Sequence, residues 1–138
     1  MVFGYTAGVF DLFHIGHLNL LKNAKGMCDK LVVGVTVDDL VTYKGKHAMI
    51  PFEDRIEIVR SCKYVDAAVP QYDMDKVKAC RELGAELLFV GDDWYGTDKW
   101  REYEADAATS GIRIVYFPYT KGVSSTQITK ALKAVRGA

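Results

Sequence analysis

Two patterns of apolar residues alternate along this chain. Short, nearly continuous apolar runs such as Leu31-Val32-Val33-Gly34-Val35 are typical of strands buried in a parallel sheet. Between them, apolar residues recur every three or four positions, as on the buried side of a helix. The continuous runs predict strands over residues 2–8, 30–36, 67–70, 87–90 and 112–117.

The periodic segments predict the helices between those strands. Pro51 suits a first helical turn, Asp73 can cap a helix that Gly84 closes, and Ser124 with Gln127 forms a capping box. Strands that alternate with helices imply right-handed crossovers, and therefore a doubly wound, parallel five-stranded sheet of the Rossmann-like α/β class. The expected helices cover residues 17–27, 51–63, 74–83, a polar segment around Trp100 and Tyr103 that ends near Gly111, and 124–135.

Composition narrows the class of protein further. The 138 residues fit one domain, 1–138, with a real core, and 49% of them are hydrophobic, which argues against disorder. Eighteen acidic residues balance 18 basic ones, which is unlike a general nucleic-acid binder. No apolar run approaches the ~20 residues of a membrane span. Met1 leads directly into a predicted strand, without the pattern of a signal peptide. The three cysteines, Cys28, Cys62 and Cys80, are odd in number and widely spaced, which suits a reducing compartment. We therefore expect a cytoplasmic protein without membrane contact.

The residues His14-Ile15-Gly16-His17 stand between the first strand and the first helix. Two histidines three apart lie on one side of a first helical turn, and Gly16 allows close approach of a ligand to the backbone. A helix start also offers free N–H groups and the positive end of the helix dipole. We therefore expect an anion cradle for a nucleotide phosphate. Two surface histidines on an ordinary helix are the alternative.

The loop after the second strand adds positive charge. Lys44-Gly45-Lys46 brings two ammonium groups, which suit the charge of a transferring phosphoryl group, although a solvated basic loop would look the same. Arg55 lies in the first turn of the next predicted helix, where its positive charge is unfavourable beside the positive end of the helix dipole. This position indicates either a nearby anion or an ion pair with Glu53 or Asp54.

Two further loops also follow strand ends. Asp92 and Asp93 suit recognition of a base, a ribose or a metal, or form a simple turn. Residues 122–126 open the last helix with hydroxyls and free N–H groups, which resembles a second phosphate cradle. Ligands of such sheets bind beyond the carboxyl ends of the strands. The unusual residues of the chain thus gather where a single phosphate-handling site is expected.

These segments carry a resemblance to a known family. Gly8-Val9-Phe10-Asp11-Leu12-Phe13-His14-Ile15-Gly16-His17 resembles the G-x-F-D-x-x-H-x-G-H signature of the cytidylyltransferases. Thr120-Lys121-Gly122-Val123-Ser124-Ser125-Thr126 resembles most of their R-T-x-G-[IV]-S-[ST]-[ST] signature. The resemblance runs from about Tyr5 to Leu132, and other segments match in order and spacing: Lys44-Gly45-Lys46, Arg55, Lys63-Tyr64-Val65-Asp66 and Gly91-Asp92-Asp93-Trp94.

The resemblance implies a nucleotidyltransferase fold and transfer of CMP from CTP to a small phosphomonoester, with Mg²⁺ and release of pyrophosphate. Glycerol 3-phosphate or a related polyol or amino-alcohol phosphate is the implied acceptor. It also implies that His14 and His17 hold the triphosphate and stabilise the transition state, and that Lys44 and Lys46 bridge the α-phosphate and the incoming phosphate. The other implied nucleotide-binding residues are Gly8, Val9, Phe10, Asp11, Arg55, Asp92, Thr120, Gly122, Val123, Ser124, Ser125 and Thr126.

Two positions depart from the family pattern. Tyr119 stands where the second signature has arginine, and Lys63 replaces another family arginine. A bidentate guanidinium is not interchangeable with either side chain. We therefore assign Lys63 and Tyr119, with Lys44, to the acceptor substrate. A tyrosine brings a flat apolar face and a polar tip, which suits selection of a substrate.

Two other functions stay open. One is an adenylyltransferase of the same fold, similar to FAD synthase, and the other is a nucleotide-binding module without turnover. We also expect a homodimer, because small members of the family are dimers and because aromatic residues are enriched in interfaces. The aromatic residues in loops and polar helices are Tyr64, Trp94, Trp100, Tyr103 and Tyr119.

Overall fold

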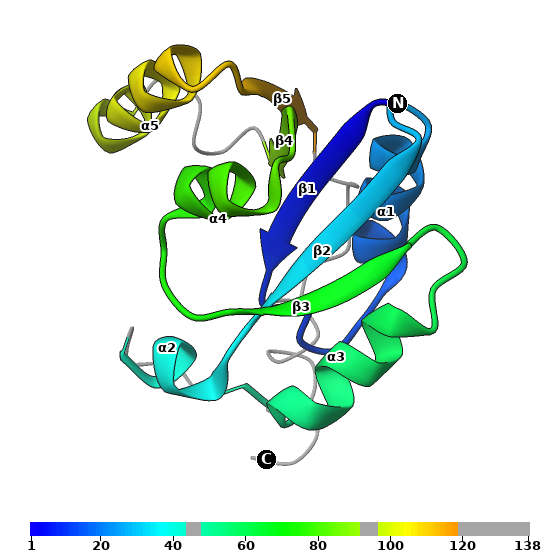
Figure 1. The fold of residues 1–138 in the computed structure, drawn as a ribbon. Coiled ribbons are helices and arrows are strands. Elements are labelled where there is room, and N and C mark those ends of the chain that lie inside the picture. The colour runs from blue at the N-terminus through cyan, green and yellow to red at the C-terminus, as the bar shows by residue number, and fades with distance from the viewer. Residues whose placement is uncertain (44–47, 92–96, 119–138) are drawn as a thin grey trace.

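The computed structural model describes residues 1–43, 48–91 and 97–118, and its centre is one parallel sheet (Figure 1). All four strand pairings are parallel, and the strand order is β3-β2-β1-β4-β5. Both features confirm the expected sheet. The strands are β1 (Phe3–Gly8), β2 (Lys30–Thr36), β3 (Ala67–Gln71), β4 (Leu87–Gly91) and β5 (Arg113–Phe117).

Helices cover the sheet on both faces, as a doubly wound fold requires. One apolar cluster joins Leu21 and Ile56 of two helices to Val33 and Val35 of β2. The cluster on the other face contains Cys80 and Trp100, among others. The helices are α1 (Ile15–Lys25), α2 (Asp38–Tyr43), α3 (Phe52–Arg60), α4 (Lys76–Leu83) and α5 (Asp98–Thr109), with α1 and α3 on one face and α4 and α5 on the other (Figure 1).

The strand order places a switch point between β1 and β4. The chain adds β2 and β3 on one side of β1 and then returns to add β4 and β5 on the other. The hydroxyl of Thr6 donates to the carbonyl of Phe89 at 2.8 Å and ties the two central strands together. In such sheets the ligand crevice opens at the carboxyl ends of the two strands at the switch point. The residues that follow β1 lie at this edge.

Several helix boundaries differ from the prediction, and α3, for example, ends at Arg60 instead of residue 63. Helix α1 begins at Ile15 instead of residue 17, because His14 acts as its N-cap. Helix α4 begins at Lys76, because Asp75 accepts the N–H of Lys78, whereas the carboxylate of Asp73 accepts the N–H of Asp75 in the preceding turn. Gly84 closes α4 with a φ of 79°, as predicted. Helix α2 lies within the predicted loop 37–51.

Trp100 also differs from the prediction, because it lies in the core and not on the surface. It is 5% exposed, and its indole N–H donates to the hydroxyl of Tyr116 at 2.8 Å. Cys28, Cys62 and Cys80 are free thiols, as expected. Within the described ranges, none of the helices has the length and apolar composition needed to cross a bilayer.

Candidate active site

The two histidines of the H-x-G-H sequence cap α1 together. The backbone N–H of Gly16 donates to Nδ1 of His14 at 3.0 Å, and the N–H of His14 donates to Nδ1 of His17 at 3.2 Å. The two rings stack with their centroids 3.9 Å apart. Each imidazole therefore uses one nitrogen to satisfy a donor at the helix start, a task that Ser, Thr or Asp usually performs.

This arrangement fixes the tautomer of both rings. A nitrogen that accepts a backbone N–H carries no proton, so each neutral ring holds its proton on Nε2. Because Nδ1 is bonded to the chain, Nε2–H is the donor left for a ligand. A helix start with two such donors also presents backbone N–H groups to an anion. The pair can therefore donate hydrogen bonds to phosphate oxygens without carrying charge itself.

The surroundings keep both histidines neutral near pH 7. The pKa of His17 is lowered to about 4, mainly by burial and also by the neighbouring His14, while Asp11 opposes the shift. Burial also lowers the pKa of His14. Protonation would place a hydrogen on Nδ1, where the backbone N–H now donates. Neutrality and capping are thus linked in both rings.

The turn before α1 holds an unusual backbone conformation. Phe10 and Leu12 adopt left-handed φ values of 54° and 50°, which side-chain-bearing residues rarely adopt. The ring of Phe10 is 4% exposed and packs edge-on against His17 with centroids 5.4 Å apart. A Cβ on Gly8 would lie 3.2 Å from this ring, so glycine leaves room for it. Phe10 thus supports the histidine pair from the core side.

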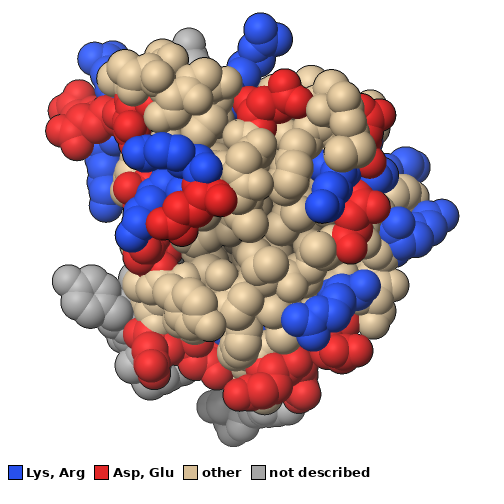
Figure 2. Space-filling view, viewed as in Figure 1, with Lys and Arg blue, Asp and Glu red and all other residues tan. Residues whose placement is uncertain are grey.

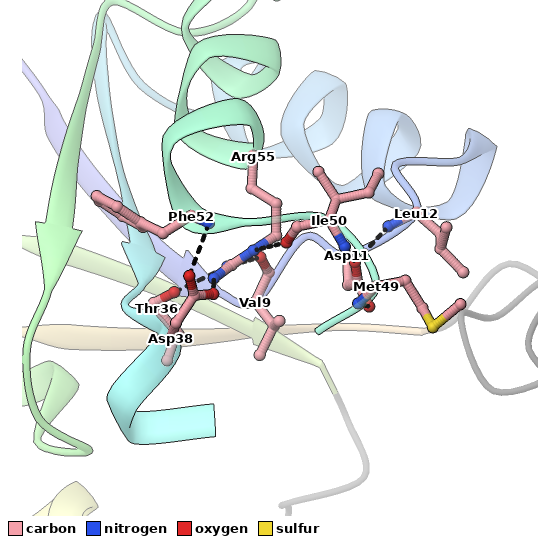
Figure 3. Close-up of polar contacts among 9 residues, drawn as sticks. All are labelled: Val9, Asp11, Leu12, Thr36, Asp38, Met49, Ile50, Phe52 and Arg55. Atoms are coloured by element: carbon pink, nitrogen blue, oxygen red, sulfur yellow. Dashed lines mark hydrogen bonds and ion pairs between the residues drawn. The ribbon is translucent and has the colours of Figure 1, made fainter. Parts of the chain in front are cut away.

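The carboxylate of Asp11 accepts hydrogen bonds from backbone N–H groups of the described residues. Its carboxylate accepts the N–H groups of Met49 at 2.8 Å and Ile50 at 3.0 Å, besides that of Leu12 at 3.1 Å (Figure 3). The family resemblance implied that Asp11 binds the nucleotide. The structure connects it to the segment that precedes α3.

Arg55 is buried, with a side chain that is 0% exposed. Its guanidinium donates to the carbonyls of Ile50 at 2.9 Å, Val9 at 2.7 Å and Thr36 at 2.8 Å. Its ion-pair partner is Asp38 at 2.6 Å, and not the neighbouring acidic residues of α3 that the sequence suggested. The guanidinium therefore bonds to the ends of β1 and β2 at once (Figure 3).

Sequence reasoning missed Asp38. Its carboxylate accepts the N–H of Phe52 at 3.0 Å as well as the Arg55 guanidinium, and these two bonds lower its pKa. A signal was present in the sequence, because Arg55 shares the side of α3 that carries Ile56 and Val59. A cation at a buried position requires an anionic partner, and Asp38 follows the end of β2.

The remaining predicted residues fall into two groups. Lys63 precedes β3, with its ammonium 5.2 Å from the centre of the Tyr64 ring. In a parallel sheet, a residue that precedes a strand lies at the amino-terminal edge, whereas the histidines follow β1 at the carboxyl-terminal edge. Within one chain, Lys63 therefore does not lie beside the histidines. Outside the described residues lie Lys44, Lys46, Asp92, Tyr119, Thr120, Gly122, Val123, Ser124, Ser125 and Thr126.

The parallel sheet and the two histidines at the start of α1 fit the nucleotidyltransferase class, and the comparisons with known proteins support this class. The model of the cytidylyltransferase-like family matches residues 5–131, and the chain belongs to this family. Glycerol-3-phosphate cytidylyltransferase of Bacillus spizizenii is 33% identical over 132 residues, which cover 94% of this chain and 96% of that protein. FAD synthase of Archaeoglobus fulgidus is 33% identical over 99 residues, 72% of each chain.

A solved structure supports the same assignment. The lipopolysaccharide core biosynthesis protein of Thermoplasma volcanium GSS1 superposes with a TM-score of 0.73 at 28% identity. The match covers 89% of this chain and 99% of that one. The expected Rossmann-like nucleotidyltransferase fold is therefore confirmed.

Proposed function

We propose that this protein transfers CMP from CTP to a small phosphomonoester, such as glycerol 3-phosphate or a related polyol or amino-alcohol phosphate. The observation that carries the proposal is the pair of neutral histidines at the start of α1, each with Nδ1 bonded to the backbone. The similarity to glycerol-3-phosphate cytidylyltransferase over nearly the whole of both chains supports the choice of substrates.

The reaction is an in-line displacement at phosphorus. An oxygen of the acceptor phosphate attacks the α-phosphorus of CTP, the bond from this phosphorus to the β-bridging oxygen breaks, and pyrophosphate leaves with that electron pair. The protein contributes positioning and stabilisation of charge. In our proposal, Nε2–H of His14 and His17 donates to the phosphate oxygens, whose charge grows in the transition state.

Other residues complete the proposed site. Lys44 and Lys46 bridge the α-phosphate and the incoming phosphate, and residues 124–126 bind the β- and γ-phosphates. The loop that contains Asp92 contacts the nucleoside. Tyr119, in the place of a family arginine, selects the acceptor. The assignment of Lys63 to the acceptor has no support within one chain, because Lys63 precedes β3.

Magnesium belongs to the proposal as the partner of the triphosphate. In the part of the chain that the structure describes, no three potential metal-ligating side chains come together. Mg²⁺ in proteins is usually held by phosphate oxygens, waters and one or two carboxylates. When bound, the ion neutralises charge on the phosphates. The histidines, which are neutral, add donors without adding positive charge.

A second candidate function is adenylyl transfer. FAD synthases are among the relatives at up to 33% identity, and this similarity supports adenylyl transfer as the second candidate. The two candidates differ in the base of the nucleotide and share the proposed chemistry at phosphorus.

Release of pyrophosphate tests the proposed function. The full-length protein is incubated with Mg²⁺, CTP and one phosphomonoester at a time, from a panel that includes glycerol 3-phosphate and amino-alcohol phosphates. We expect acceptor-dependent pyrophosphate with at least one of them. Tight CTP binding without pyrophosphate from any acceptor would instead identify a binding module.

A further inference from the structure

The peptide units around Ile50 are held from two sides. The N–H of Ile50 donates to Asp11 at 3.0 Å, and its carbonyl accepts from Nε of Arg55 at 2.9 Å. The preceding N–H, of Met49, donates to the other carboxylate oxygen of Asp11 at 2.8 Å. Side chains from the turn after β1 and from α3 thus fix one short stretch of backbone (Figure 3).

A third side chain holds the same stretch two residues later. The N–H of Phe52, the first residue of α3, donates to Asp38 at 3.0 Å. Asp38 is also the ion-pair partner of Arg55. We call Asp11, Asp38 and Arg55 the polar clamp. Together they engage backbone groups of residues 49, 50 and 52, which follow the sequence position of Lys44 and Lys46 closely.

The polar clamp also bonds to the sheet. Arg55 donates to the carbonyls of Val9 and Thr36, which lie at the ends of β1 and β2. Val9 is followed directly by the left-handed residues that surround Asp11. The clamp therefore connects the turn that leads into His14 with the segment that leads out of the lysine loop.

We propose that Asp11, Asp38 and Arg55 are positioning residues, which hold residues 49–52 against the turn that leads into α1 and so keep His14 and His17 aligned for catalysis. This inference rests on the proposed function. It assigns Asp11 and Arg55 a role toward the chain and not toward the nucleotide. Burial supports it, because four N–H bonds of the fully covered Arg55 side chain already have acceptors within the protein.

The clamp predicts a specific split in kinetic constants. A small misplacement of catalytic groups lowers kcat, so we expect Asp11→Ala and Arg55→Met to lower kcat by about 10-fold to 10²-fold. The KM for CTP should change by less than about threefold, because ground-state contacts with the nucleotide are kept. Asp11→Asn keeps an acceptor for one N–H and should recover part of the loss.

Amide hydrogen exchange of the unliganded full-length protein provides the second readout. Both variants should lose protection in residues 48–52, while protection in β4 is kept. Arg60→Met on the same helix is the control for Arg55→Met, because Arg60 is half exposed. Asp29→Ala is the control for Asp11→Ala, because Asp29 accepts the N–H of Val2 near the start of β1. Neither control should change exchange in 48–52 or kcat.

Three outcomes decide the proposal. Lost protection together with a lower kcat and a steady KM supports it. Unchanged protection with weaker CTP binding would overturn it, since the side chains would then act as nucleotide ligands. Lost protection with an unchanged kcat would also overturn it, since the role would be structural only. If the wild-type protein lacked CTP turnover, the proposed function would fail. The polar clamp would then be tested by amide hydrogen exchange alone. Unchanged protection of residues 48–52 in both variants would refute the clamp.

Discussion

Each histidine of the H-x-G-H sequence uses its two ring nitrogens for different tasks. Nδ1 accepts a backbone N–H at the start of α1, and Nε2–H is available to a ligand. Alanine at either position removes both tasks together. Asparagine separates them, because its side-chain oxygen takes the place of Nδ1 and asparagine is a favourable N-cap.

We predict that His14→Asn lowers kcat by about 10²-fold to 10³-fold, the usual effect of losing one donor to a transition state. Its free energy of unfolding should stay within about 0.5 kcal/mol of wild type, whereas His14→Ala should lose about 1 kcal/mol more because the cap is gone. Steady-state kinetics and urea unfolding provide the two measurements. Near-wild-type kcat in His14→Asn would contradict the proposed role of Nε2.

The lowered pKa of His17 predicts an acid-sensitive fold. The folded pKa of about 4 lies below the ordinary value of 6.5, so the unfolded chain takes up the proton first as the pH falls. The stability that neutral His17 contributes to the folded state is fully present above pH 6.5 and is lost as the pH falls toward about 4. Urea unfolding between pH 7 and pH 4 should show the loss, with a shallower slope in His17→Asn. Equal slopes would count against a buried neutral His17.

The sequence predicted the location of the histidine pair at the start of α1, but not its capping bonds. H-x-G-H contains none of the usual capping residues, so the start of α1 was placed two residues late. Arg55 was recognised as a misfit at a helix start, yet its partner Asp38 lies 17 residues away in the chain. Such a partner emerges only when β1, β2 and α3 are placed together.

The strands were predicted closely because buried parallel strands are continuous apolar runs. Helix α2 was missed because it has six residues and a single turn carries little periodicity. The Asp-x-Asp sequence before α4 offered two possible caps, and only the turn geometry selects the second. Short elements and alternative caps are therefore where the pattern of the sequence is least informative.

Strand β2 contains a glycine whose role is steric. A Cβ at Gly34 would lie 1.9 Å from the hydroxyl oxygen of Tyr5, whose ring is buried and whose hydroxyl bonds to Gln71. We predict that Gly34→Ala destabilises the protein by about 2 kcal/mol through overpacking. Gly26→Ala is the matched control, because Gly26 has an ordinary helical φ of −64° and no neighbour closer than 3.4 Å. Equal urea midpoints for the two variants would refute the steric explanation.

We propose a homodimer, although the argument from exposed aromatic residues fails within the described residues, because Trp100 is buried and Tyr64 and Tyr103 pack against the core. Uncharged residues occupy the middle of the face in Figure 2, and charged side chains surround them. Tyr72, which is 74% exposed, and Leu83, which is 38% exposed, line one hollow with Val69. Asp73, Lys78 and Glu82 line the same hollow, and exposed apolar side chains beside charged ones are typical of a protein interface.

We predict that the wild-type protein sediments as a dimer at micromolar concentration and that Leu83→Glu sediments as a monomer, because the added charge would be buried in the interface. Ile58→Glu is the control, since Ile58 is 40% exposed on α3, on the opposite side of the sheet. This control should remain a dimer. A monomeric wild-type protein in sedimentation equilibrium would contradict the proposal of a homodimer. If both variants remained dimers, the face that carries Leu83 would not be the dimer interface.

The choice between CTP and ATP distinguishes the two candidate functions, because the relatives include both glycerol-3-phosphate cytidylyltransferases and FAD synthases. The full-length protein is given equal concentrations of both nucleotides, Mg²⁺ and the acceptor that releases most pyrophosphate, and the product is identified by mass spectrometry. We predict that nearly all of the product carries CMP and that His14→Asn forms it far more slowly. A product that carries AMP, or an unimpaired His14→Asn, would contradict it.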